Sequence, residues 1–201
     1  MIVREIIPIN TKKSKIVFDD GECFALYKGE IRRLDIEIGR EIGEEEYYTT
    51  IYPTLKKRAF ARLLHILEIS FKSENDIIKK LRLSFYPDEA IKEAIEKAVK
   101  IGYIDDERYA KRYVATYKDK YSKLKLKYKL MEKGINKEII ENALEEAYID
   151  ELPKIKRLLE KKHYFETDEF EKKQKIIASI MRQGYKYTEI KDIINDISTE
   201  I

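Results

Sequence analysis

Apolar positions at the start of the chain alternate in the way that is typical of β-strands. Two β-prone runs, 15–18 and 23–27, flank a turn that contains Asp20-Gly21, and Asp-Gly is a strong hairpin signal. The alternation over 31–38 predicts a further strand after a turn at 28–29. The first fifty residues are therefore expected to form a small β segment.

Beyond the acidic run at 44–46 and Pro53, which indicate a junction, helix formers dominate and the sequence repeats. Leu81, Leu130 and Ile180 are each followed ten and fourteen residues later by further apolar side chains. Each unit predicts three helices, and the units should stack because one alone buries its apolar faces poorly. The predicted helices span 54–69, 74–84 and 88–101, then 106–121, 123–133 and 137–148, then 152–164, 168–183 and 188–197.

The expected fold is mainly α, with three tandem three-helix repeats in an elongated array, preceded by a small N-terminal β-hairpin segment. Gly134 and Gly184 follow the middle helices at equivalent places, where a residue with positive φ commonly ends a helix. Phe85 holds that place in the first repeat, so its helix is expected to end through Tyr86-Pro87 instead. The expected parts are the β segment 1–52 and the three repeats 53–104, 105–149 and 150–201.

Composition excludes several classes of site. The single cysteine, Cys23, excludes a disulfide framework within the chain and a multi-cysteine metal site. The two histidines, His65 and His163, lie too far apart for a zinc motif, and His65, among apolar neighbours, is expected to be structural. Asp105 and Asp150 are placed to cap the helices that follow them. The sequence contains no recognisable phosphate-binding loop, no pair of residues placed for general acid–base catalysis and no activated nucleophile. We therefore expect no catalytic residue, metal or cofactor.

Membrane association is not expected either. No stretch approaches the roughly 18 consecutive apolar residues that a membrane-spanning helix needs. Arg4 and Glu5 interrupt the N-terminus, which therefore does not resemble a signal peptide. The sequence favours a cytoplasmic protein.

Charge is nearly balanced overall, at a formal +3, but it is unevenly distributed. Residues 107–137 hold eleven Lys or Arg against Glu107, Asp119 and Glu132, which favours an anionic partner. The last helix of each repeat is acidic instead, so DNA phosphates would repel it from the major groove. Tyr109, Tyr113, Tyr117 and Tyr121 share a helix face with apolar residues, so core packing explains them better than base stacking does.

Several segments resemble the RecX family of recombination regulators. The stretch 102–110, Gly-Tyr-Ile-Asp-Asp-Glu-Arg-Tyr-Ala, is similar to the most characteristic motif of the family. The segments 130–135 and 140–144 resemble its second repeat, 61–64 its first and 182–185 its third. The resemblance covers roughly 54–197. Phe85 in place of a glycine and the lack of an arginine in 66–69 depart from the family pattern, and the β segment is similar to an extension that some members carry.

The resemblance implies a non-enzymatic regulator, mainly an inhibitor, of the bacterial RecA recombinase. Such a protein binds the RecA–DNA filament and modulates its ATPase, strand-exchange and coprotease activities in homologous recombination and SOS DNA repair. The implied partners are RecA and the single- or double-stranded DNA within the filament, and a monomer is expected. The contact face expected for this partner comprises Arg108, Lys111, Arg112, Lys118, Lys123, Lys125, Lys129 and Lys133.

Two questions stay open at this point. Filament capping, binding along the filament groove and filament disassembly are all compatible with the sequence. The alternative function is a DNA-binding transcriptional regulator of the helix-turn-helix type, whereas a nuclease is disfavoured because no set of metal ligands or nucleophiles is visible.

Overall fold

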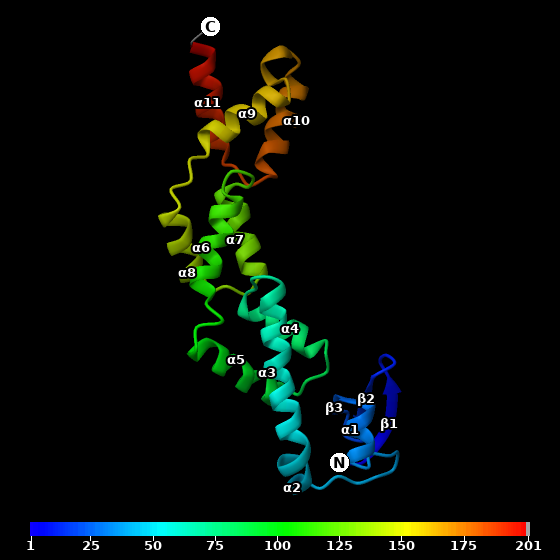
Figure 1. Ribbon diagram of the computed structural model, residues 1–201. Helices are drawn as coiled ribbons and strands as arrows, with labels where there is room; N and C mark the ends of the chain where they lie inside the picture. The colour runs from blue at the N-terminus through cyan, green and yellow to red at the C-terminus, as the bar shows by residue number, and fades with distance from the viewer. Residues whose placement is uncertain (200–201) are drawn as a thin grey trace. The chain divides into compact units, whose positions relative to one another are not determined.

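The computed structural model describes residues 1–199, and its internal contacts divide the chain into two compact units, Met1–Asp105 and Asp106–Ile201 (Figure 1). In the first unit the strands are β1 (Val3–Pro8), β2 (Lys13–Phe18) and β3 (Cys23–Tyr27), and the helices are α1 (Lys28–Arg33), α2 (Glu44–Glu46), α3 (Tyr52–Ile69), α4 (Glu74–Arg82) and α5 (Asp88–Lys100). In the second unit they are α6 (Asp106–Tyr117), α7 (Lys123–Glu132), α8 (Lys137–Glu146), α9 (Leu152–Lys161), α10 (Phe170–Met181) and α11 (Tyr187–Thr199).

The N-terminal strands form a three-stranded antiparallel sheet in the order β1-β2-β3. The predicted hairpin is confirmed, with Ile16 opposite Phe24. Its turn uses Gly21 at φ +89°, and the carboxylate of Asp20 accepts a hydrogen bond from the backbone N–H of Glu22 at 2.9 Å. Strand β1 was not predicted, because the sequence Val-Arg-Glu-Ile-Ile-Pro lacks clean alternation.

The predicted turn and strand between 28 and 38 are wrong. Residues 28–33 form helix α1, and the carboxylate of Glu30 accepts a hydrogen bond from the backbone N–H of Tyr27 at 2.8 Å. The chain then turns at Asp35, which has φ +50°. Helix capping by Glu30 therefore outweighs the weak β alternation of this segment.

The junction expected at Pro53 falls within a continuous helical segment. Helix α2 continues through a π-helical turn, Tyr47–Ile51, directly into α3. Pro53 lies in the first turn of α3, where its missing N–H is tolerated. The chain between the β segment and the first repeat is thus helical from Glu44 onward.

One hydrophobic core serves the whole first unit. Fully buried Leu26 from β3 belongs to the same cluster as Leu55 and Leu63 of α3 and Leu81 of α4. Helix α3 packs against α5 and α4. The sheet therefore shares its core with the first three-helix repeat, and the four-part division of the chain stays a proposal.

The middle helix of the first repeat ends in an unexpected way. Phe85 itself adopts a left-handed backbone, with φ +59°, at the place where Gly134 has φ +77° and Gly184 has φ +94°. The N–H of Tyr86 donates to the carbonyl of Leu81 at 3.3 Å, which is the bond that closes a Schellman motif. The expectation that Phe85 avoids this conformation is wrong.

Contacts from the sheet hold Phe85 in this conformation. The backbone N–H of Ala25 in β3 donates to the carbonyl of Phe85 at 3.1 Å. The ammonium of Lys15 in β2 lies 4.9 Å from the centroid of the Phe85 ring, a distance at which cation–π attraction operates. Strained conformations of this kind persist where neighbouring contacts fix them.

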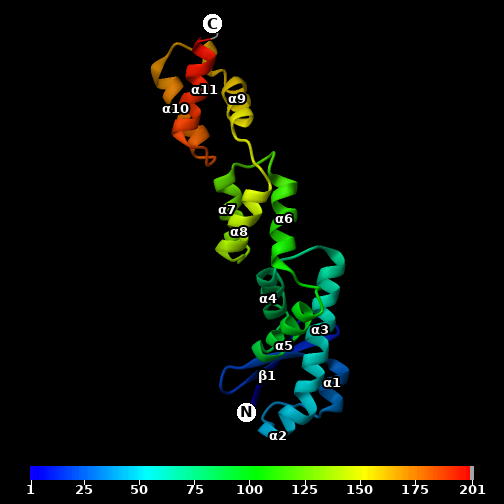
Figure 2. The same cartoon turned by 90° about the vertical axis from the view of Figure 1, so that its left-hand side faces the viewer.

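The second unit contains the second and third repeats (Figure 2). Within the second repeat α6 packs on α8 and both contact α7, and α6 ends at Tyr117 rather than at 121. In the third repeat a 3₁₀ turn, Tyr164–Glu166, follows α9. Asp150, which is predicted to cap α9, lies one residue before the N-cap Glu151, and its carboxylate accepts a hydrogen bond from the N–H of Leu152 at 3.0 Å.

Polar contacts join the second and third repeats. The hydroxyl of Ser122 donates to the carbonyl of Gln183 at 2.7 Å and accepts from the N–H of Lys125 at 3.2 Å. A Cβ on Gly184 would lie 2.5 Å from this hydroxyl oxygen, so only glycine fits there. The ammonium of Lys154 donates to the backbone carbonyls of Lys118 and Tyr121, in the turn that follows α6.

Across residues 1–199 no helix is long and apolar enough to cross a bilayer. His65, which is expected to be structural, has a side chain that is 56% exposed and lies 3.5 Å from the carboxylate of Glu68. The apolar neighbours of His65 in sequence point into the core, whereas His65 occupies the opposite side of α3.

Candidate partner-binding surface on the second repeat

Four tyrosines, which we call the tyrosine stripe, follow one side of α6 and the turn after it: Tyr109, Tyr113, Tyr117 and Tyr121. Successive ring centroids lie 6.1, 4.6 and 5.6 Å apart. Tyr109 is only 8% exposed and packs in the core, whereas the other three are half-buried. The stripe therefore begins in the core and ends near the surface.

The environment of Tyr113 keeps its phenol protonated. Burial, followed by the neighbouring phenols and Glu132, raises the pKa of Tyr113 to about 12. A protonated phenol is neutral and offers an O–H donor. Tyr113 consequently adds no negative charge that would compensate nearby lysines at neutral pH.

Three lysines surround the last ring of the stripe. The ammonium groups of Lys120, Lys125 and Lys129 lie 5.5, 5.0 and 5.6 Å from the centroid of the Tyr121 ring. Lys125 and Lys129 are one turn apart on α7 and so share a helix face. We call Tyr121 and these three lysines the Tyr121 cluster. It combines an aromatic ring with concentrated positive charge, which suits phosphates or carboxylates of a partner.

Local structure fixes the position of this cluster. The N–H of Tyr121 donates to the carbonyl of Tyr117 at 3.0 Å, which extends the turn of α6. Ser122 then caps α7 through the N–H of Lys125, a standard start for a helix. The ring and the two α7 lysines are thus brought together by the short connection between the two helices.

Lysines on the other side of the repeat are paired with the acidic helix α8. Lys111 forms a 2.9 Å ion pair with Glu146, and Lys127 forms one of 3.1 Å with Glu141. The hydrogen bond from Lys127 lowers the pKa of Glu141. The carboxylates of α8 therefore compensate positive charge within the repeat.

The eight residues of the expected contact face do not lie together. Lys125 and Lys129 meet at Tyr121, whereas Lys111 faces α8, and Lys118 and Lys123 lie beside the start of α9, where the N–H of Lys123 donates to Glu151 at 2.7 Å. Arg108 and Arg112 are exposed on α6, and Lys133 is half-buried.

Lys120 belongs to the cluster but not to the expected face. Its position three residues after Tyr117 places it on the tyrosine side of a continuing helix. That spacing is the signal that could have identified it.

The second repeat is also the part of the chain that matches a family model. The model describes the second three-helix domain of RecX and matches residues 105–144. The regulatory protein RecX of Clostridium acetobutylicum is 32% identical over 184 residues, which cover 87% of this chain and 80% of the relative. The chain belongs to the RecX family. The RecX of Caldanaerobacter subterraneus is 31% identical over 199 residues and covers 97% of this chain and 99% of its own.

Solved RecX structures share the fold. A crystal structure of regulatory protein RecX aligns with a TM-score of 0.64 at 23% identity, over 95% of this chain and 98% of that chain. RecX from Lactobacillus salivarius aligns with a TM-score of 0.61 at 23% identity, over 73% and 99%. The mainly α class with an N-terminal β segment is thus confirmed, with a three-stranded sheet in place of a hairpin. RecX membership places the chain among regulatory proteins.

Proposed function

We propose that this RecX protein regulates the RecA recombinase, mainly as an inhibitor, by binding the RecA–DNA filament. The proposal includes modulation of the filament's ATPase, strand-exchange and coprotease activities in homologous recombination and SOS repair. It further holds that the protein is not an enzyme and acts as a monomer in the cytoplasm. Family membership is the observation that carries the proposal, because the family model covers the repeat in which the basic residues gather.

The Tyr121 cluster is the centre of the proposed contact face. The described neighbours of Lys125 and Lys129 include an aromatic ring, whereas Lys111 is already paired with Glu146. A filament of protein and nucleic acid presents both acidic side chains and phosphates, to which exposed ammonium groups are complementary. Phosphate contacts supply affinity without preference for a DNA sequence. A protein that regulates filaments formed on DNA of any sequence requires contacts of this kind.

Inhibition of ATP hydrolysis tests the proposal directly. RecA filaments of the same organism are formed on single-stranded DNA first, and the protein is then titrated in while ATP hydrolysis is followed. We expect the rate to fall. An unchanged rate at a stoichiometric excess would overturn the proposal, and sequence-specific binding to duplex DNA without RecA would then favour the helix-turn-helix regulator.

A pair of charge-reversal variants tests the contact face. The double variant Lys125→Glu/Lys129→Glu should need at least about tenfold more protein for half-inhibition, because two charge-assisted contacts become repulsive. The matched control Lys92→Glu/Lys100→Glu changes the same charge on exposed positions of α5 and should inhibit like the unaltered protein. Equal inhibition by both double variants would remove the Tyr121 cluster from the contact face.

The dose dependence separates the modes of action. A fall in rate at substoichiometric protein would support capping or disassembly, because few filament ends control many subunits. A fall that needs one protein per few RecA subunits would support binding along the filament groove.

A further inference from the structure

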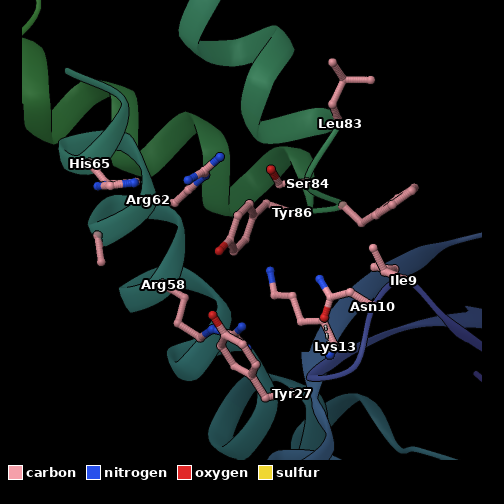
Figure 3. A pocket seen from close by; sticks show the side chains of 12 residues that line it. Ile9, Asn10, Lys13, Tyr27, Arg58, Arg62, His65, Leu83, Ser84 and Tyr86 are labelled. Atoms are coloured by element: carbon pink, nitrogen blue, oxygen red, sulfur yellow. Dashed lines mark hydrogen bonds between the residues drawn. The ribbon is translucent and has the colours of Figure 1, made fainter. Parts of the chain in front are cut away.

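A cavity of about 470 Å³ lies between the N-terminal sheet and the first repeat (Figure 3). Three segments line it: the sheet with Lys13 and Tyr27, helix α3 with Arg58, Arg62 and His65, and the connection from α4 to α5 with Tyr86. Its volume lies within the range of small-molecule sites, roughly 300–1,000 Å³. The cavity is contained in the first unit.

Cationic groups converge on this cavity. Two of them, Arg58 and Arg62, lie four residues apart on α3 and so share one helix face, which also holds the side chain of His65. The ammonium of Lys13 approaches them from the opposite side and lies 5.3 Å from the ring centroids of both Tyr27 and Tyr86. In the described chain, the residues that line the cavity include no aspartate or glutamate.

Positive charge in the cavity is only partly compensated. Arg58 forms an ion pair with Glu30 through Nη1, and its guanidinium stacks 4.0 Å from the Tyr27 ring centroid. Its buried Nη2 has no hydrogen-bond partner among the residues that the structure describes. The carboxylate of Glu30 therefore offsets only part of the positive charge beside the cavity, and an anion bound there would interact favourably with the rest.

The electrostatic environment of Lys13 supports the same conclusion. Burial and the positive charges of Arg58 and Arg62 lower the pKa of Lys13, and Glu30 opposes them. The three cations are therefore close enough to repel one another, and a single carboxylate does not offset that repulsion. A bound anion would relieve it.

Apolar side chains border the same cavity. Leu83 is 78% exposed and Ile9 is 42% exposed, although both line the cavity, and the Phe85 ring is half-buried beside them. A simple inorganic anion would gain no favourable contact from these apolar side chains. A nucleotide would, because it joins a phosphate to a planar base that packs on apolar and aromatic side chains.

We propose that this cavity, the sheet–repeat pocket, binds a nucleotide, with its phosphate between Lys13, Arg58 and Arg62 and its base against Leu83 and Phe85. The nucleotide is either free or one unit of a single-stranded nucleic acid, since both carry the same chemistry. The proposal does not depend on regulation of RecA, because it concerns the other compact unit and its test contains no RecA.

Calorimetric titration tests the pocket with two probes, ADP and a 20-mer of deoxythymidylate. Arg62→Gln removes one exposed cation that lines the pocket, and Lys57→Gln removes an exposed cation of α3 outside it as a matched control. Affinity should fall about tenfold in Arg62→Gln, as expected for the loss of a charge-assisted phosphate contact, and stay unchanged in Lys57→Gln. Leu83→Ser should weaken binding of the nucleotide but not of inorganic phosphate.

The probes identify the source of the nucleotide. If ADP binds with an affinity that depends on Arg62, the ligand of the pocket is a free nucleotide. If only the 20-mer binds in this way, the ligand is a single-stranded nucleic acid. No saturable binding of either probe would overturn the proposal, as would equal affinities of Arg62→Gln and Lys57→Gln. Tighter, Arg62-dependent binding of a decaglutamate peptide would overturn it in favour of an acidic protein partner. Thermal unfolding of each variant checks that the fold is intact.

Discussion

The middle helices of the first and second repeats end in the same left-handed backbone conformation, but on different residues. Gly134 reaches its positive φ without a Cβ, whereas Phe85 does so with an aromatic side chain. For an ordinary L-residue that conformation costs about 1–2 kcal/mol. In the first repeat the cost is offset by Ala25 and Lys15 from the sheet.

The comparison shows that the sheet completes the first repeat. A repeat that ends on glycine closes its own helix, as the second repeat does. The first repeat depends on contacts from residues 15 and 25, which lie far earlier in the chain. The same sheet also supplies one wall of the sheet–repeat pocket, so the structural and the proposed binding roles of the segment coincide.

The largest expected effect comes from breaking the shared core of the sheet and the first repeat. Leu26→Ala truncates a fully buried side chain in β3 and should lower the free energy of unfolding by about 2–5 kcal/mol. Urea unfolding followed by circular dichroism measures it. The control is Ile7→Ala in β1, where the side chain is 42% exposed and the effect should be much smaller. If both substitutions cost the same, the sheet is not part of the core of the repeat.

A smaller effect is expected where the second repeat meets the third. Gly184→Ala forces both a left-handed alanine and a contact with the hydroxyl of Ser122, and it should cost about 1–3 kcal/mol. Gly39→Ala is the matched control, because Gly39 has φ +87° but open space around a new Cβ. Thermal and urea unfolding compare the two. Ser122→Ala has a cost of its own, because it removes the cap of α7, so a double-mutant cycle is needed. The losses from Gly184→Ala and Ser122→Ala should be less than additive in the double variant, and additive losses would contradict the steric explanation.

The smallest expected effect concerns Phe85 itself. Phe85→Gly relieves the left-handed strain but adds freedom to the unfolded chain, which costs roughly 0.5–1 kcal/mol, and it removes the ring beside Lys15. The free energy of unfolding should therefore change by less than about 1 kcal/mol. Gly134→Ala, which introduces the strain without supporting contacts, should be destabilising by a comparable or larger amount. A large loss in Phe85→Gly would mean that the ring, rather than the sheet, holds the turn.

Much of the fold could be predicted from spacing alone. The repeat anchors Leu81, Leu130 and Ile180 are all fully buried, as their regular separation requires. The hairpin around Gly21 followed from local turn chemistry. The predictions that were wrong concern segments whose conformation depends on their surroundings. The segment that was expected to be a strand forms a helix with a cap at Glu30. Contacts from the sheet stabilise Phe85 in a left-handed conformation that was expected only of glycine.

The candidate sites were less predictable because they depend on tertiary contacts. Spacing correctly places Lys125 and Lys129 on one side of their helix, but it cannot show that Glu146 pairs with Lys111. The sheet–repeat pocket draws on three segments that are separated in sequence. No local pattern around Lys13 or Arg62 indicates that these two side chains approach the same cavity.

The unbroken helical path from α2 through the π-helical turn into α3 has a consequence for protein engineering. The β segment cannot be exchanged between RecX proteins as an independent module, since its strands share one buried core with the first repeat. A chimera joined within the helical path would transfer the strands without the partner surface that buries them. Successful grafts should therefore carry both the segment and the first repeat.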